Sequence, residues 1–149
     1  MILVSVVAGL ICRIKRVNTE RTICIALLAA YVLFILFQTV IGREQKTFRA
    51  EWIPFWSYHH PALYTEIILN YLLFIPLGIL LYGTYGERIG LKVVLIGCAL
   101  STGIEITQLI FRIGLFEFDD IIGNTIGCLM GAGLAKIIKL LIKSRMENR

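Results

Sequence analysis

Carboxylate and amide side chains recur at helical spacing in the second half of this 149-residue chain. Glu105 and Gln108 are three residues apart inside one apolar run, and Asp120 and Asn124 are four apart at the start of the next. Residues at these spacings share one face of an α-helix. If the two faces meet, the carboxyl groups could act as an acid and base pair, and the amides could bind a polar ligand. What these residues can do depends on the elements that carry them.

Those elements are predicted to be membrane-spanning helices. Hydrophobic residues make up 58% of the chain and charged residues 17%, which is too apolar for an ordinary soluble domain. A spanning helix needs roughly 20 apolar residues. We therefore predict an all-α fold, a polytopic membrane helix bundle, as a single membrane domain over residues 1–149. The expected spans are residues 22–42, 65–85, 91–111 and 119–141, and residues 1–12 form a shorter helix that either spans in part or lies in the interface.

The basic residues predict the orientation of the bundle. Lys and Arg cluster at the ends of the apolar runs, where they act as topology signals rather than as a nucleic-acid surface. With the C-terminus in the cytoplasm, eleven of the fifteen Lys and Arg residues lie inside and four lie outside. The expected location is the plasma membrane, with several spans and a cytoplasmic C-terminus. Membrane lipids are the expected surroundings, and no nucleic acid is expected as a partner.

In this topology the polar residues of three spans reach a similar depth. At about 1.5 Å per residue they lie roughly 5 to 10 Å below the outer surface. A carboxylate inside a span is costly, so Glu105 needs a partner or a proton, and this cost favours a shared polar pocket over isolated burial. We expect one outward-facing pocket, roofed by the aromatic segment of residues 52–60. Its candidate ligand-binding residues are Glu66, Asn70, Ser101, Glu105, Gln108, Arg112, Asp119, Asp120 and Asn124.

A purely structural interpretation competes with this pocket. Asp119 and Asp120 could cap the last helix and complement its dipole. Polar amides within spans often only join helices by hydrogen bonds. Gly123, Gly127 and Gly131, four residues apart, are interpreted as a helix-packing face, because glycine lets a neighbouring backbone approach closely. Glu105 is the residue that this interpretation explains least well.

Motifs for metal, cofactor or nucleophilic chemistry are not found in the sequence. The four cysteines all lie in apolar runs without metal-ligand spacing, and His59 and His60 are adjacent, which does not suit one shared metal ion. No Ser/His/Asp order is apparent. We therefore expect no metal and no cofactor, and we assign no catalytic residue.

Several motifs in order resemble the VanZ-like family of bacterial membrane proteins, which is named after a glycopeptide (teicoplanin) resistance determinant. The motifs are Ile53-Pro54-Phe55-Trp56-Ser57-Tyr58, Asn70-x-x-x-Phe74-x-Pro76-x-Gly78, Ser101-x-x-x-Glu105-x-x-Gln108 and Phe118-Asp119-Asp120-x-x-x-Asn124-Thr125-x-Gly127-x-x-x-Gly131. The resemblance centres on residues 50–135 and extends over about 22–142. It implies a multi-pass protein of a Gram-positive-type plasma membrane that affects susceptibility to glycopeptide antibiotics or tolerance of envelope stress. It implies no reaction mechanism.

Two main functions follow as hypotheses. In the first, the outward acidic and amide pocket binds an amphiphilic or cationic ligand in the outer leaflet, such as a lipid-linked wall intermediate or a lipoglycopeptide. In the second, the protein is an intramembrane enzyme that acts on lipid headgroups, with Glu105 and Asp120 as acid and base. A transporter is disfavoured by the few spans and the lack of an inverted repeat. A scaffold would instead use the face formed by Gly127 and Gly131.

Overall fold

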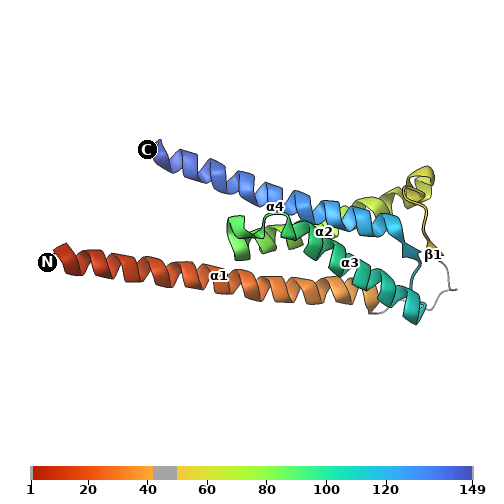
Figure 1. Cartoon of the computed structure of the whole chain (residues 1–149), viewed down its shortest axis with the longest axis horizontal. Coiled ribbons are helices and arrows are strands. Elements are labelled where there is room, and N and C mark those ends of the chain that lie inside the picture. Colours follow the sequence, from red (N-terminus) through yellow and green to blue (C-terminus); the bar gives the residue numbers. More distant parts are fainter. Residues whose placement is uncertain (1, 42–49, 149) are drawn as a thin grey trace.

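The described part of the chain contains four long helices, two very short strands and three single-turn helices (Figure 1). A computed structural model describes the backbone of residues 2–41 and 50–148 and the side chains of residues 19–41, 50–61 and 63–148. The long helices are α1 (Ile2–Val40), α2 (Tyr64–Tyr85), α3 (Lys92–Phe111) and α4 (Phe118–Glu147). The strands are β1 (Ala50–Glu51) and β2 (Phe116–Glu117), and the 3-10 helices are η1 (Ser57–His59), η2 (Pro61–Leu63) and η3 (Gly86–Ile89).

Among the residues that the structure describes, four helices are long and apolar enough to cross a membrane, so the all-α polytopic bundle is confirmed. The candidate spans are Thr19–Val40, Tyr64–Ile89, Lys92–Phe111 and Phe118–Glu147. They agree with the predicted spans to within a few residues, except that α4 continues to Glu147. Gly42, the last residue of the first predicted span, lies outside the described residues.

The short N-terminal helix expected over residues 1–12 is not a separate element. Its described residues belong to α1, which runs without a break from Ile2 to Val40. The connecting stretch of residues 13–21 has neither Pro nor Gly, and its Arg and Lys residues favour a helix. A helix of 39 residues is about 58 Å long, so α1 exceeds the roughly 30 Å of a bilayer core.

Helices α2 and α4 form the central pair of the bundle. A methyl group added at Gly131 would overlap the carbonyl oxygen of Ile75, and one at Gly127 would overlap that of Tyr71. Gly123 lies against the Tyr71 ring with ordinary spacing. The glycine face of α4 therefore lets its backbone lie directly against α2, and the fully buried ring of Phe74 belongs to the same core.

The other two helices pack around this pair. Gly97 places α3 against Cys128 of α4. Tyr31 joins α1 to α2, because its hydroxyl donates to the backbone oxygen of Leu73 over 2.9 Å. The two termini lie at one end of the bundle, which we call the terminal end, and the two strands lie at the other, which we call the loop end (Figure 1).

Two segments far apart in sequence meet at the loop end. Strands β1 and β2 pair in parallel, with Ala50 opposite Phe116 and Glu51 opposite Glu117. This short pairing fixes the start of α4 beside the segment that leads into α2. The contact thereby positions Glu117 and the two aspartates that follow it, Asp119 and Asp120.

Candidate functional site

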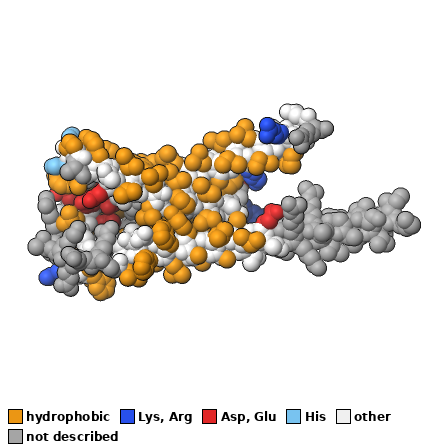
Figure 2. Space-filling model, turned by 180° about the vertical axis from the view of Figure 1, so that it is seen from behind, with side chains coloured by type: hydrophobic (Ala, Val, Ile, Leu, Met, Phe, Trp, Pro, Cys, Tyr) orange, Lys and Arg blue, Asp and Glu red, His pale blue; other side chains and the backbone are white. Residues whose placement is uncertain are grey.

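A cleft of about 740 Å³ opens at the loop end among α1, α2, α3 and the start of α4. Figure 2 shows Asp and Glu side chains gathered at this end of the molecule, whereas the Lys and Arg side chains of α4 lie toward the other end. The residues that line the cleft are Tyr31, Gln38, Thr39, Glu66, Leu69, Asn70, Leu72, Leu73, Gln108, Ile113, Leu115, Glu117 and Asp120.

The polarity of the cleft changes along the bundle axis. Glu66 stands in the first turn of α2 and Asn70 one turn further along the helix. Leu72 and Leu73 follow, and Leu73 is tied to Tyr31 of α1. From Glu66 to Leu73, about 10 Å along the helix, the lining changes from mostly carboxylate and amide to aliphatic. Leu69, Ile113 and Leu115 also line the cleft, so its outer part combines polar and aliphatic side chains, whereas its inner part is mainly apolar.

Glu105 lies behind the cleft rather than in it. Its side chain is 2% exposed, and its Oε2 accepts a hydrogen bond from the backbone N–H of Glu117 at 3.1 Å. Gln108, one turn along α3, lines the cleft and donates from Nε2 to the backbone oxygen of Thr39 at 3.0 Å. Helical spacing thus puts both residues on the face of α3 that joins β2 and α1.

Asn124 and Ser101 form a second buried contact between helices. Asn124 donates from Nδ2 to Ser101 Oγ at 2.8 Å, and Ser101 Oγ donates to the backbone oxygen of Asp120 at 3.5 Å. The Asn124 Oδ1 atom is buried without a hydrogen-bond partner among the described residues. This contact joins α3 to the first turns of α4, so it sets where the Asp120 carboxylate enters the cleft.

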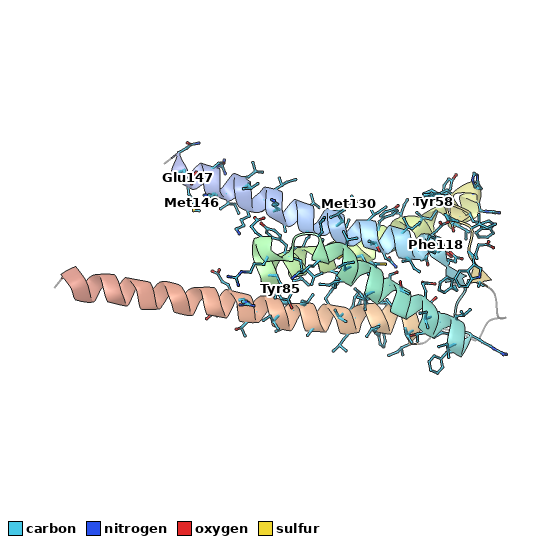
Figure 3. The ribbon with its side chains drawn as sticks, viewed as in Figure 1. Tyr58, Tyr85, Phe118, Met130, Met146 and Glu147 are labelled. Carbon is cyan, nitrogen blue, oxygen red and sulfur yellow. The ribbon has the colours of Figure 1, made fainter. Side chains whose placement is uncertain are left out.

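Asp119 points to the loop instead of the cleft. Its Oδ1 accepts from the backbone N–H of Phe55 at 2.5 Å and its Oδ2 from that of Ser57 at 2.8 Å. Phe55 has a φ of +64°, a conformation that non-glycine residues seldom adopt. Trp52 stacks near Phe116, with 4.5 Å between ring centres. Figure 3 shows Tyr58 of this loop and Phe118 of α4 at the same end of the molecule.

The nine predicted pocket residues therefore do not share one cavity. Glu66, Asn70, Gln108 and Asp120 line the cleft. Ser101, Glu105 and Asn124 are buried behind it, and Asp119 faces the loop. Arg112 is exposed at the C-terminal end of α3, where it takes a left-handed conformation with φ +56°. The aromatic segment does not roof the cleft as expected, because residues 52–60 are not among those that line it.

Sequence reasoning missed four lining residues that matter for the shape of the cleft. Tyr31, Gln38 and Thr39 come from α1, and Glu117 comes from β2. The adjacent polar pair Gln38 and Thr39 at the end of an otherwise apolar span could have pointed to α1. Glu117 precedes Asp119 by two residues and could have been included with the aspartates.

The lining residues allow hydrogen bonding and acid–base chemistry. Glu66, Glu117 and Asp120 supply carboxylates, and Asn70 and Gln38 supply amides. Among the residues whose side chains are described, no three His, Cys, Asp or Glu groups are placed to hold one metal ion.

Comparison with known proteins places this arrangement in a family. The profile of the VanZ/LLP1 family matches residues 22–139, which is most of the chain. The chain belongs to the VanZ/LLP1 family. This VanZ-family chain is also 29% identical to Protein VanZ of Enterococcus faecium over 118 residues, which cover 72% of this chain and 70% of that protein. No solved structure matches the VanZ-family chain.

Proposed function

We propose that this VanZ-family protein binds an amphiphilic ligand in the outer leaflet through the cleft and thereby contributes to glycopeptide resistance. The polarity gradient of the cleft is the observation that carries the proposal. An amphiphile in a leaflet has its polar group at the surface and its chain toward the middle of the bilayer. Carboxylates and amides at the loop end, with Leu72 and Leu73 further in, complement that arrangement.

The size and position of the cleft support a ligand that enters from the lipid. A volume of about 740 Å³ falls in the usual range for pockets that hold small molecules. Leu69 and Leu72 are both lining residues and exposed on the surface of α2 that lipid would contact. A lipid-linked wall intermediate and a lipoglycopeptide both combine an alkyl chain with a large polar group. These two are the ligand classes we propose.

In the orientation we propose, the cleft faces the outer side of the membrane. With the terminal end in the cytoplasm, the basic end of α4 lies on the inner side, as the distribution of Lys and Arg favours. Ligands of wall synthesis and glycopeptide antibiotics act on the outer side, so the cleft would face them.

A substitution that fills the cleft tests the proposal without removing a polar contact. Leu69→Trp adds bulk to the lining of the cleft. The control Ile68→Trp adds the same bulk at the preceding residue, which does not line the cleft and is equally exposed (57% for Ile68, 56% for Leu69). In a susceptible Gram-positive host, the minimum inhibitory concentration of teicoplanin should fall to the vector level with Leu69→Trp. It should stay at the wild-type level with Ile68→Trp, at equal membrane abundance.

Polar variants provide an independent check. Asp120→Asn and Glu66→Gln should each lower resistance, whereas Glu147→Gln, an exposed carboxylate at the terminal end, should not. If the three single variants Leu69→Trp, Asp120→Asn and Glu66→Gln all kept full resistance, a role for the cleft would be refuted. A wild-type chain that raises no inhibitory concentration would refute the contribution to resistance.

An intramembrane enzyme is the second candidate, and one observation favours it. Glu66, Glu117 and Asp120 place three carboxylates on one cleft, where one could protonate a leaving group and another could activate water. Purified protein in nanodiscs with labelled envelope lipids, with and without Mg²⁺, tests this candidate. Turnover that Asp120→Asn abolishes would support an enzyme, and no turnover in either condition would count against it.

A further inference from the structure

The segment of residues 52–60, which we call the aromatic loop, presents large apolar side chains outward at the loop end. Trp52, Ile53 and Phe55 are 62%, 63% and 56% exposed. We propose that these three side chains insert into the headgroup layer of the adjacent membrane leaflet, so that the partner of the aromatic loop is a lipid surface. This interaction is separate from ligand binding in the cleft, because residues 52–60 do not line it.

The backbone of the aromatic loop is held in one conformation by hydrogen bonds. Both carboxylate oxygens of Asp119 accept backbone N–H groups of the loop, at 2.5 and 2.8 Å. A carboxylate acceptor makes these hydrogen bonds stronger than neutral ones. They hold Phe55 at a positive φ, which a bulky residue adopts only when its surroundings impose it. The result is a fixed turn with Ile53 and Phe55 on its outer side.

The tyrosine hydroxyls at the loop are bonded within the protein, so they do not interrupt the apolar surface formed by Trp52, Ile53 and Phe55. The hydroxyls of Tyr58 and Tyr71 are hydrogen-bonded at 2.8 Å, and the Tyr64 hydroxyl donates to the backbone oxygen of Tyr58 at 3.1 Å. Partial burial and the bond to Tyr71 raise the pKa of Tyr58 to about 12, so its hydroxyl stays neutral. An uncharged aromatic cluster of this kind suits the membrane interface.

The position of the loop identifies lipid as the partner. The loop leads directly into α2, whose span starts at Tyr64, and it is bonded to the first turn of α4, whose span starts at Phe118. The loop therefore lies at the depth where these spans leave the hydrocarbon. Its exposed face continues into Tyr64 and Ile68, which are exposed on the surface of α2 that lipid contacts. Trp and Tyr are enriched at this depth in membrane proteins.

Tryptophan fluorescence with brominated lipids measures the insertion directly. The chain has two tryptophans, Trp52 and Trp56, so Trp56→Phe leaves Trp52 as the only one. The full chain is reconstituted into phosphatidylcholine vesicles whose acyl chains carry bromine either near the headgroup or near the chain end. We expect the shallow bromines to quench Trp52 at least about twofold and more strongly than the deep ones. Acrylamide in the water should quench it weakly.

Two further variants control for local packing. Trp52→Phe leaves Trp56, which is half-buried and stacked 4.2 Å from His60, and its quenching by shallow bromines should be smaller. Asp119→Asn weakens the two loop bonds and should reduce the quenching of Trp52 in the Trp56→Phe background. Circular dichroism shows whether each variant keeps its helices, and Trp56→Tyr replaces Trp56→Phe if that variant does not fold.

The alternative results overturn the proposal. Strong quenching by acrylamide and none by brominated lipid would place Trp52 in water. Quenching by neither would mean that protein, from a second copy or another partner, covers the loop. Because no cleft residue is changed, these results are independent of the resistance phenotype that tests the proposed function.

Discussion

At the scale of single residues, one carboxylate has a role different from the one its position suggests. Asp119 sits in the first turn of α4, where an acidic side chain would be expected to complement the helix dipole. Its two oxygens instead bind backbone N–H groups of Phe55 and Ser57, more than sixty residues earlier in the chain. The neighbouring Asp120 faces the cleft. The two adjacent aspartates therefore have different roles: Asp119 binds the loop, and Asp120 lines the cleft.

The Asp119 contacts predict a local effect of Asp119→Asn. Removing the charge and one acceptor oxygen should cost about 1.5–3 kcal/mol of loop attachment. Hydrogen exchange at the amides of Phe55 and Ser57 should then accelerate by about ten- to a hundredfold, while the amides of α2 keep their protection. Glu147→Gln is the matched control and should leave all of these amides unchanged. Equal protection in Asp119→Asn and wild type would contradict the assigned bonds.

Gln108 allows a second residue-scale prediction. Gln108→Ala removes the donor to the buried Thr39 backbone oxygen and should lower the free energy of unfolding by about 1–3 kcal/mol. Gln38→Ala changes the same side-chain type at an exposed position and should have an effect within about 0.5 kcal/mol. Thermal unfolding in detergent measures both. Equal stability of the two variants would show that Gln108 does not join α3 to α1.

At the scale of elements, the contact between α2 and α4 depends on glycine. Gly127 and Gly131 lie directly against backbone carbonyls of α2, whereas Gly133 has nothing within 4 Å of the position of an added methyl group. The three residues share one helix but not one environment. Close approach of these two helices fixes the bundle onto which α1 and α3 pack.

This difference predicts opposite results for the same substitution. Gly131→Ala must push α4 away from Ile75 and should destabilise the fold by about 1–3 kcal/mol or more. Gly133→Ala enters open space and should be neutral or stabilise the helix by up to about 1 kcal/mol. Thermal unfolding of the purified variants gives the comparison. Similar melting temperatures for both variants would contradict the tight α2–α4 contact.

At the scale of the whole molecule, four spans bring both termini to one side (Figure 1). We predict that this is the cytoplasmic side, because most Lys and Arg residues then lie inside. A membrane-impermeant maleimide applied to intact cells should label His59→Cys at the loop end. It should label Ser144→Cys at the terminal end only after the membrane is opened. The wild-type chain, with its own cysteines, gives the background, and the reverse labelling would invert the topology.

The sequence by itself determined the spans and their polar faces. Span length and the absence of charge are local properties, so the runs of residues 65–85 and 91–111 predicted α2 and α3 closely. Helical spacing also put Glu105 with Gln108 on one face of α3. The family resemblance carried by these motifs is confirmed by the match over residues 22–139.

Only the tertiary structure decided which faces meet. The parallel pairing of Glu51 with Glu117 and the bonds from Asp119 to the loop join segments more than sixty residues apart, and two-residue strands leave no periodic pattern to read. The lateral arrangement of helices separates Glu105 from the cleft and brings Tyr31 of α1 into it. Periodicity fixes the direction of a side chain around its own helix, but a shared site depends on the neighbours of that helix, which only long-range packing selects.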